Sequence, residues 1–247
     1  MPAYLIRKLE RFTRLSADDK RALERAVAGR ERCLGAREDI VREGDRPRHV
    51  NLILTGYACR YKMLEDGRRQ IMAFFVPGDL CELRVFILRQ MDHSIATVAP
   101  TRLAEIPRDA VQELTERHPR VTRALWWNTL VDAAISREWT VNVGQRTAIE
   151  RLAHLLCEFF VRSRAVGRTE GDSCELPMTQ IELADALGLS PVHTNRVLQE
   201  LRASGLIALR NGMLSIPDLE ALQVVALFDP TYLHLDHEGQ EFDANES

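Results

Sequence analysis

The chain has 247 residues, 45% of them hydrophobic, and its formal net charge is −3. This length is enough for two domains of ordinary size, and the charge is not the strongly basic balance typical of many nucleic-acid-binding proteins. No apolar run approaches the ~20 residues needed to cross a bilayer. Residues 1–14 lack the apolar core of a secretory signal. We therefore expect a cytoplasmic protein with no membrane partner.

The cysteines are scattered along the chain, at Cys33, Cys59, Cys81, Cys157 and Cys174. No pair has CxxC spacing, and no Cys/His group has the spacing of zinc ligands. We expect reduced, mostly buried thiols, no metal site and no cofactor. The sequence also lacks a nucleophile elbow, a phosphate loop, a dinucleotide fingerprint and a zinc-protease motif. We therefore predict that the protein is not an enzyme and has no catalytic residues.

Residues 38–106 consist of short alternating apolar segments separated by turn residues, among them Asp66-Gly67 and Pro77-Gly78-Asp79. Closely spaced segments of this kind predict an antiparallel β sandwich or barrel. Before them, residues 16–28 are typical of a helix capped by Ser16. The first part of the chain is thus expected to be a β domain.

Residues 119–144 contain no helix breaker between Pro119 and Gly144, which predicts one long helix. Apolar residues recur along it with the alternating spacing of a coiled coil, at Ala124, Trp127, Val131, Ala134 and Val141, and the face is widened by Trp126, Leu130 and Ile135. We expect one side of the helix to meet a partner helix and the other to cover the β domain. The alternative is an ordinary buried helix.

The strongest motif begins at Thr179. Thr179 and Glu182 have the spacing of a capping box, and Gly188 is placed to end the helix that they begin. Ser190 is then expected to cap a second helix that has Pro191 at its first position. The inward face of the first helix is expected at Ile181, Ala184 and Leu187. A helix, a short glycine-containing turn and a second helix together predict a helix-turn-helix.

Side chains near the start of the second helix are expected to reach DNA base edges. Arg196 is suited to guanine, and Asn195 or Gln199 to adenine. Hydroxyl groups and first-turn N–H groups are suited to phosphates. The predicted DNA-binding residues are Thr179, Ser190, Pro191, Val192, His193, Thr194, Asn195, Arg196 and Gln199. The alternative is a helical hairpin with a solvated polar face.

A small hairpin is predicted after the second helix, with Asn211-Gly212 at its turn, and would form a wing. Between residues 176 and 216, three arginines are balanced by three acidic residues: Arg196, Arg202 and Arg210 against Glu182, Asp185 and Glu200. Because this charge is modest, we expect DNA affinity to depend on two copies binding together.

These segments resemble the family of the cyclic-AMP receptor protein and the fumarate–nitrate regulator, or Crp/Fnr. The resemblance lies in Glu43-Gly44-Asp45, Leu54-Thr55-Gly56, Pro77-Gly78-Asp79 and Glu82-Leu83, and above all in residues 181–184, 195–198 and 204–207. It implies an α+β chain: a cyclic-nucleotide-binding-like β jelly roll as sensor (1–118), a long dimerisation helix and hinge (119–144) and a C-terminal winged helix-turn-helix (145–228). An acidic tail (229–247), expected to fray, would follow.

The effector pocket implied by the resemblance contains Glu82, Leu83, His93 and Ser94. Cyclic-AMP binders have a Gly-Glu-Leu segment and then Arg-Ser, but here Cys81 replaces the glycine and Asp92-His93-Ser94 stands in the Arg-Ser region. A neutral histidine beside an aspartate is a poor substitute for a guanidinium fork. We expect an effector other than cyclic AMP; the alternative is a cyclic-nucleotide-responsive regulator with a divergent pocket.

Other family cofactors are not expected. No cysteine precedes Cys33, so the N-terminal cysteine cluster of iron–sulfur members is missing. Haem ligation would call on Cys81 or His93, which we expect instead to be a core thiol and a surface histidine.

The expected function is a dimeric, signal-gated transcription regulator. Its two recognition helices would bind half-sites about one helical turn apart on near-palindromic double-stranded DNA. A signal, such as a small-molecule effector, would act through a hinge near residues 142–145. RNA polymerase would be a further partner of an activator. A nucleotide-gated subunit of an enzyme or channel would need a catalytic domain or membrane spans, and the sequence has neither.

Overall fold

The N-terminal half of the chain is a β jelly roll, as predicted. The computed structural model describes residues 2–83 and 87–235. One antiparallel sheet has the order β1 (Arg30–Leu34), β8 (Thr101–Pro107), β3 (His49–Thr55) and β6 (Leu80–Cys81). The other has the order β2 (Asp39–Val41), β7 (Ser94–Thr97), β4 (Ala58–Met63) and β5 (Arg69–Phe75). Two packed sheets of this kind enclose an apolar core between them.

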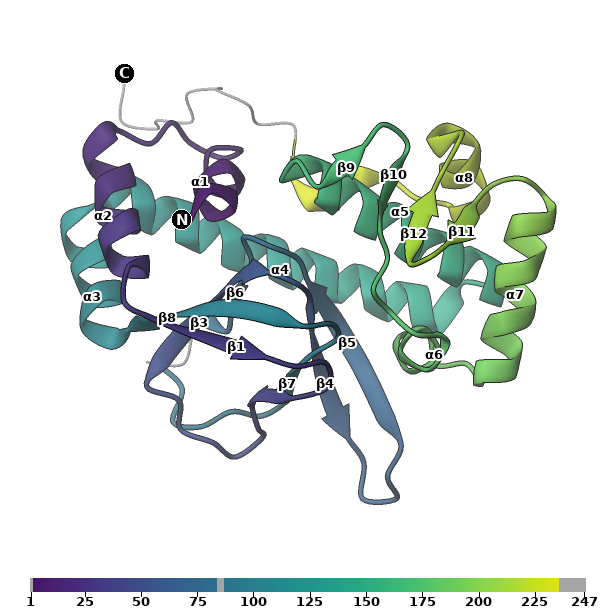
Figure 1. Ribbon diagram of the computed structural model, residues 1–247, viewed down its shortest axis with the longest axis horizontal. Helices are drawn as coiled ribbons and strands as arrows, with labels where there is room; N and C mark the ends of the chain where they lie inside the picture. The colour runs from purple at the N-terminus through teal and green to yellow at the C-terminus, as the bar shows by residue number, and fades with distance from the viewer. Residues whose placement is uncertain (1, 84–86, 236–247) are drawn as a thin grey trace.

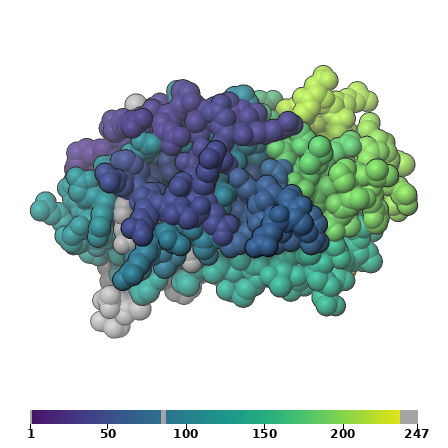
Figure 2. Space-filling view, turned by 90° about the horizontal axis from the view of Figure 1, so that it is seen from below, coloured from purple at the N-terminus to yellow at the C-terminus, as the bar shows by residue number. Residues whose placement is uncertain are grey.

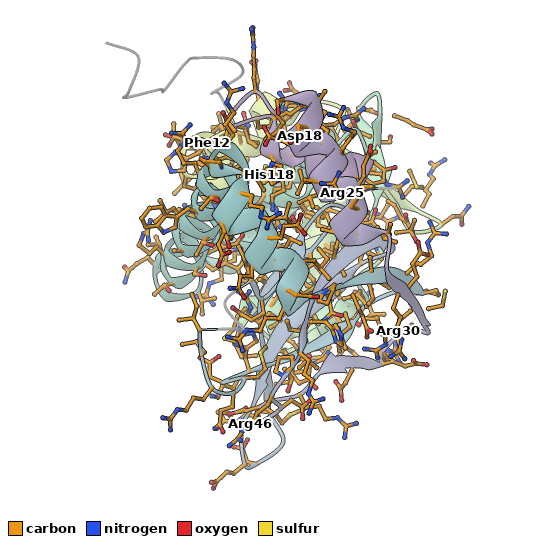
Figure 3. The ribbon with its side chains drawn as sticks, turned by 90° about the vertical axis from the view of Figure 1, so that its left-hand side faces the viewer. Phe12, Asp18, Arg25, Arg30, Arg46 and His118 are labelled. Carbon is orange, nitrogen blue, oxygen red and sulfur yellow. The ribbon has the colours of Figure 1, made fainter. Side chains whose placement is uncertain are left out.

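Among the described residues, four α-helices accompany the jelly roll: α1 (Ala3–Leu9), α2 (Ala17–Val27), α3 (Arg108–Arg117) and α4 (Pro119–Gln145). Ser16 caps α2 as predicted, because its hydroxyl accepts a hydrogen bond from the Asp19 N–H at 3.1 Å. The Asp19 carboxylate also lies 2.9 Å from Nδ1 of buried His118. His118 precedes α4 and lies between α2 and α3 (Figure 3), so this contact fastens α2 to the start of the long helix.

Helix α4 is one long helix, as predicted, and most of the predicted coiled-coil seam faces the rest of the chain. Four of the five predicted seam residues are buried against the chain itself: Ala124, Trp127, Val131 and Ala134. The large apolar side chains left exposed are Trp126, at 71%, Leu130, at 62%, and Val141. Apolar periodicity finds both stripes of such a helix but does not say which one its own β domain covers.

The C-terminal domain is a winged helix. Its elements are α5 (Ala148–Ala165), β9 (Thr169–Glu170), β10 (Ser173–Glu175), α6 (Gln180–Leu187), α7 (Pro191–Ala203), β11 (Ala208–Arg210), β12 (Met213–Ser215), α8 (Leu219–Ala226) and a 3₁₀ turn (Pro230–Leu233). The strands form one small sheet in the order β11–β12–β10–β9. The sequence did not predict the hairpin of β9 and β10.

Two predicted boundaries move. Gly144 does not end α4, which continues to Gln145, so the change of direction comes at Arg146 and Thr147. The first residues of the predicted tail do not fray: Leu233 is buried, and the Tyr232 hydroxyl donates a hydrogen bond to Glu158 at 2.8 Å. The acidic residues from Asp236 onward lie outside the described residues.

The jelly roll and the C-terminal domain share a core. Phe74 of β5 packs on Trp139 of α4, and Tyr57 packs on Phe159 of α5, with ring centroids 6.0 and 5.7 Å apart. Helix α4 runs along the molecule from α3 to the C-terminal domain (Figure 1). In the space-filling view the strands of the jelly roll near residue 70 (blue) adjoin the C-terminal domain (green; Figure 2). The two domains are thus in direct contact, besides being joined by α4.

A buried ionic cluster reinforces that contact. The Arg162 guanidinium of α5 lies 2.8 Å from the Asp79 carboxylate in the jelly roll and 3.1 Å from that of Glu158. Lys8 of α1 reaches the other oxygen of Asp79 at 2.7 Å. Burial alone would raise the pKa of Asp79, but Lys8 and Arg162 outweigh it and lower the pKa. Asp79 is therefore held as a carboxylate between two cations from different parts of the chain.

None of the helices within residues 2–83 and 87–235 combines the length and apolarity that a membrane span requires. Within the same ranges, no three His, Cys, Asp or Glu side chains gather as metal ligands. Four of the cysteines are buried and Cys33 is exposed, as expected for mostly buried, unpaired thiols.

Candidate nucleic-acid interface and sensor pocket

Helix α6 has the predicted caps. The Thr179 hydroxyl accepts from the Glu182 N–H at 3.3 Å, and the Glu182 carboxylate accepts from the Thr179 N–H at 2.7 Å. Gly188 ends the helix with a φ of 63°, a conformation that glycine adopts readily. Ala184 and Leu187 point inward as predicted, but Ile181 is exposed, and Leu183 takes its place in the core. The helix is therefore rotated slightly from the predicted orientation.

Helix α7 projects from the domain with a row of exposed side chains. Ser190 caps it by accepting from the His193 N–H at 3.2 Å, and Pro191 occupies its first position. Val192, His193, Arg196 and Gln199 are exposed, and Asn195 is half-buried. Val197, Leu198 and Leu201 hold the opposite face in the core. The first turns of α7 thus offer side chains of several chemistries to a surface outside the chain.

Thr194 does not belong to that row. Its side chain is fully buried, and its hydroxyl has no hydrogen-bond partner among the described residues. A phosphate cannot reach it in this structure, so the prediction that Thr194 contacts DNA was wrong. The helical period explains the difference, because Thr194 falls between the outward positions 192 and 196 and shares the inward face with Val197.

The wing forms as predicted. Strands β11 and β12 pair with Arg210 opposite Met213, and the turn residues Asn211 and Gly212 have φ of 53° and 75°. Two positive φ values are typical of a type I′ turn, which Asn-Gly favours. Arg210 is exposed beside the turn. The wing therefore adds a cation to the same domain as Arg196.

The electrostatics of this domain are more favourable to DNA than the count of charges suggested. Glu182 is buried and committed to the cap of α6. Asp185 pairs with Arg69 of the jelly roll at 2.7 Å. Of the three acidic residues that offset the arginines, one is thus paired with a cation outside this domain and another is buried in a helix cap. Arg196 and Arg210 face fewer competing carboxylates than the sequence implied.

The predicted effector pocket comes together in part. His93 lies between two carboxylates, with Nε2 at 3.2 Å from Glu82 and Nδ1 at 2.7 Å from Asp92. The Ser94 hydroxyl accepts from the Glu43 N–H at 3.0 Å. Leu83 lies elsewhere, at a groove beside Val111 of α3 and Leu125 of α4. Glu82, His93 and Ser94 therefore share one region of the jelly roll, and Leu83 does not.

Arg60 belongs to this region and was missed. Its guanidinium lies 3.6 Å from the Glu82 carboxylate and over the ring of Phe75. A lone arginine within the alternating apolar run 57–63 was the available clue, because a charge on a strand of a closed β domain needs a partner. His93 is buried, so the expectation of a surface histidine was wrong. Cys81 is a core thiol as expected, and burial raises its pKa.

Another buried cluster lies where α4 meets α5. Arg146 Nη2 and His154 Nε2 lie 2.6 and 3.3 Å from the same oxygen of Glu138. The rings of Phe228 and Tyr232 cover His154, with centroids 5.0 and 5.9 Å away. Both ring nitrogens of His154 lack a hydrogen-bond partner among the described residues. The joint between the two domains thus contains an uncharged histidine that is poorly satisfied.

Replacing His154 by phenylalanine should make the free energy of unfolding less dependent on pH below pH 7. Burial and the neighbouring Arg146 lower the pKa of His154 to about 3. Between pH 6.5 and that value the unfolded chain binds a proton that the folded chain does not, so stability falls as pH falls. His154 alone should lower the free energy of unfolding of the wild type by about 2 kcal/mol between pH 7 and pH 5. Urea unfolding at pH 7, 6 and 5 measures the difference, and parallel profiles for the two proteins would contradict this account.

Comparison with known proteins gives a consistent result. Residues 31–118 match the model of the cyclic nucleotide-binding domain, and residues 150–225 match that of the Crp-like helix-turn-helix domain. The chain is 31% identical over 181 residues to the transcriptional activator protein FnrL of Cereibacter sphaeroides, covering 70% of this chain and 71% of that one. It is 27% identical over 198 residues to the nitrogen fixation regulation protein FixK of Bradyrhizobium diazoefficiens, covering 80% and 82%.

A solved structure also resembles this chain. The structure of FixK2 from Bradyrhizobium japonicum has 25% sequence identity to this chain and a TM-score of 0.72, and the match covers 79% of this chain and 96% of that one. These relatives are transcription regulators rather than enzymes. As its sequence motifs predicted, the chain belongs to the Crp/Fnr family of DNA-binding transcription regulators.

Proposed function

We propose that the protein is a dimeric regulator that binds a specific, near-palindromic operator through α7. The observation that supports this most is the row of exposed side chains on the first turns of α7, where Arg196 forms no ion pair with an acidic side chain of the described residues. The proposed DNA contacts are Thr179, Ser190, Pro191, Val192, His193, Asn195, Arg196 and Gln199. Arg196 would bind guanine bidentately, and Ser190 with the first-turn N–H groups would bind phosphate. Since its partner is DNA, we place the protein in the cytoplasm.

The dimer interface that we propose is the exposed stripe of α4. Trp126, Leu130 and Ala133 are exposed with spacings of four and three residues, and Val141 extends the stripe toward the C-terminal domain. A helix of 27 residues with such a stripe has the pattern of a coiled-coil strand whose partner is an equal helix. Two copies joined along α4 would place one recognition helix at each half-site.

We propose that the signal arises in the jelly roll and is not a cyclic nucleotide. The region around His93 already contains the carboxylates of Glu82 and Asp92, and Arg60 is engaged with Glu82. A cyclic phosphate placed there would face two negative charges. This favours an effector of another kind over the cyclic-nucleotide alternative.

The path that we propose from this region to DNA is the hairpin of β4 and β5. Arg60 lies on β4, and at the other end of the hairpin Arg69 pairs with Asp185 of α6. The Gln70 side chain also donates to the Ala186 carbonyl at 3.2 Å. A shift of the hairpin would therefore move the first helix of the helix-turn-helix. Because FnrL is named a transcriptional activator, we further propose activation, with RNA polymerase as a partner.

Selection from random duplex DNA with the full chain tests this function. The wild type should sediment as a dimer and select two inverted half-sites about one helical turn apart, about 34–36 Å. Leu130→Glu should be monomeric and lose retention of the selected duplex, because a carboxylate would be buried in the α4 interface. Val224→Glu, at an exposed position of α8, is the matched control and should behave as wild type.

Adding cyclic AMP should leave the retention of the selected duplex unchanged. A selection that enriches no sequence would overturn the DNA-binding proposal. Enrichment of a single, non-inverted site by a monomer would overturn the dimer. Tighter retention with cyclic AMP would instead support the divergent-pocket alternative.

A further inference from the structure

We infer that Val192 contacts the methyl group of a thymine in each half-site, beside the guanine bound by Arg196. The inference rests on the proposed function and specifies part of the operator. Val192 is 74% exposed at the second position of α7, among the most exposed large apolar side chains of the described residues. None of the described residues covers it, although the opposite face of α7 packs tightly.

The chemistry of the major groove limits which base group such a side chain can contact favourably. Valine has no hydrogen-bonding group, so it cannot bind the donors and acceptors of guanine, cytosine or adenine. The thymine C5-methyl is the apolar group that base pairs present in that groove. Burying Val192 against this methyl removes apolar surface of both partners from water. A contact with phosphate or with a base lacking the methyl gives no such gain.

The position of Val192 relative to Arg196 locates the thymine. The two residues are four apart on α7, so they lie on the same face, about 6 Å apart along the helix axis. Base pairs are stacked about 3.4 Å apart. The thymine is therefore expected within about two base pairs of the guanine that Arg196 binds. His193 points to a different side of α7 and does not compete for this position.

Deoxyuridine scanning of the selected operator tests the inference, because uracil differs from thymine only by the missing methyl. One thymine position is replaced at a time, and the equivalent thymine of the other half-site is replaced with it. The dissociation constant of each duplex is then measured for the full-length wild type, Val192→Ala and Val224→Ala. Val224 is 75% exposed on α8, so it matches Val192 in type and exposure but lies outside the DNA-binding residues. Both substitutions remove an exposed side chain and spare the core.

One thymine position should stand out. There, deoxyuridine should weaken wild-type binding by about fourfold per half-site, or about 15-fold for both, the effect of losing one buried methyl each time. Val192→Ala should show no loss at that position, and Val224→Ala should show the full loss. Equal sensitivity of wild type and Val192→Ala at every thymine would overturn the inference but leave DNA binding intact. A wild type that selects no sequence would overturn the proposed function, and this inference with it.

Discussion

Arg196→Ala should abolish specific operator binding and leave the dimer and the fold intact. Arg196 is exposed on α7, so its removal leaves no buried group unpaired. Each bidentate arginine–guanine pair contributes ~1–3 kcal/mol of discrimination. Two such pairs in a dimer imply a loss of about 100-fold or more in specific affinity. Gel retention of the selected operator, set against a scrambled duplex of equal length, measures this loss.

The matched control is Arg202→Ala. Arg202 lies on the same helix and is also exposed, but it stands in the last turn, where its guanidinium donates to Gln199 at 3.5 Å. It should lower binding to operator and scrambled duplex alike, as the loss of one positive charge does. If specific binding survives Arg196→Ala, Arg196 does not recognise a base. If both variants lose binding equally, Arg196 contributes only its positive charge.

Arg162→Ala should cause a large loss of stability, because it breaks a buried ionic cluster at the domain interface. The guanidinium lies between the buried carboxylates of Asp79 and Glu158 and also donates to the Phe74 carbonyl at 2.9 Å. Removing one partner of a buried ionic contact costs ~3–5 kcal/mol, since the remaining charge is left without compensation. For a chain of this size that corresponds to about a 10 °C fall in Tm.

Thermal unfolding followed by circular dichroism checks this expectation. Arg162→Lys retains the charge but not the fork that reaches both carboxylates, so it should fall between the wild type and the alanine variant. Arg202→Ala supplies the baseline for losing an exposed arginine. A change in Tm for Arg162→Ala no greater than this baseline would mean that the cluster adds nothing to stability.

The features that the sequence predicted well are those whose causes are local. The caps of α6 and α7 depend on residues within three positions of one another, such as Thr179 with Glu182. The Asn211-Gly212 turn depends on the φ values that two adjacent residues can adopt. Such signals act over a few residues and need no knowledge of the rest of the fold. The order of elements followed from them, and so did the helix-turn-helix.

The features that it missed depend on which surface a side chain meets. On α4, both apolar stripes have the right spacing, and only the position of the jelly roll buries Trp127 and leaves Trp126 exposed. Thr194 and Ile181 differ from prediction for the same reason. Contacts between distant segments were equally out of reach, as with Arg162 and Asp79, which are 83 positions apart. Which face of a helix is buried, and which distant residues pair, are decided by tertiary packing, and a single sequence does not show that packing.

The pairing of Arg69 with Asp185 has a consequence for the construction of chimaeras. Helix α6 contacts the hairpin of β4 and β5, whereas α7 carries most of the proposed base contacts. Grafting a foreign α7 alone leaves Asp185 opposite Arg69, so a hybrid regulator would change its operator and keep its own control. Grafting α6 and α7 together replaces Asp185, and the hybrid would bind the new operator without responding to the signal. On the proposed route, the boundary between control and sequence preference would therefore lie at Gly188.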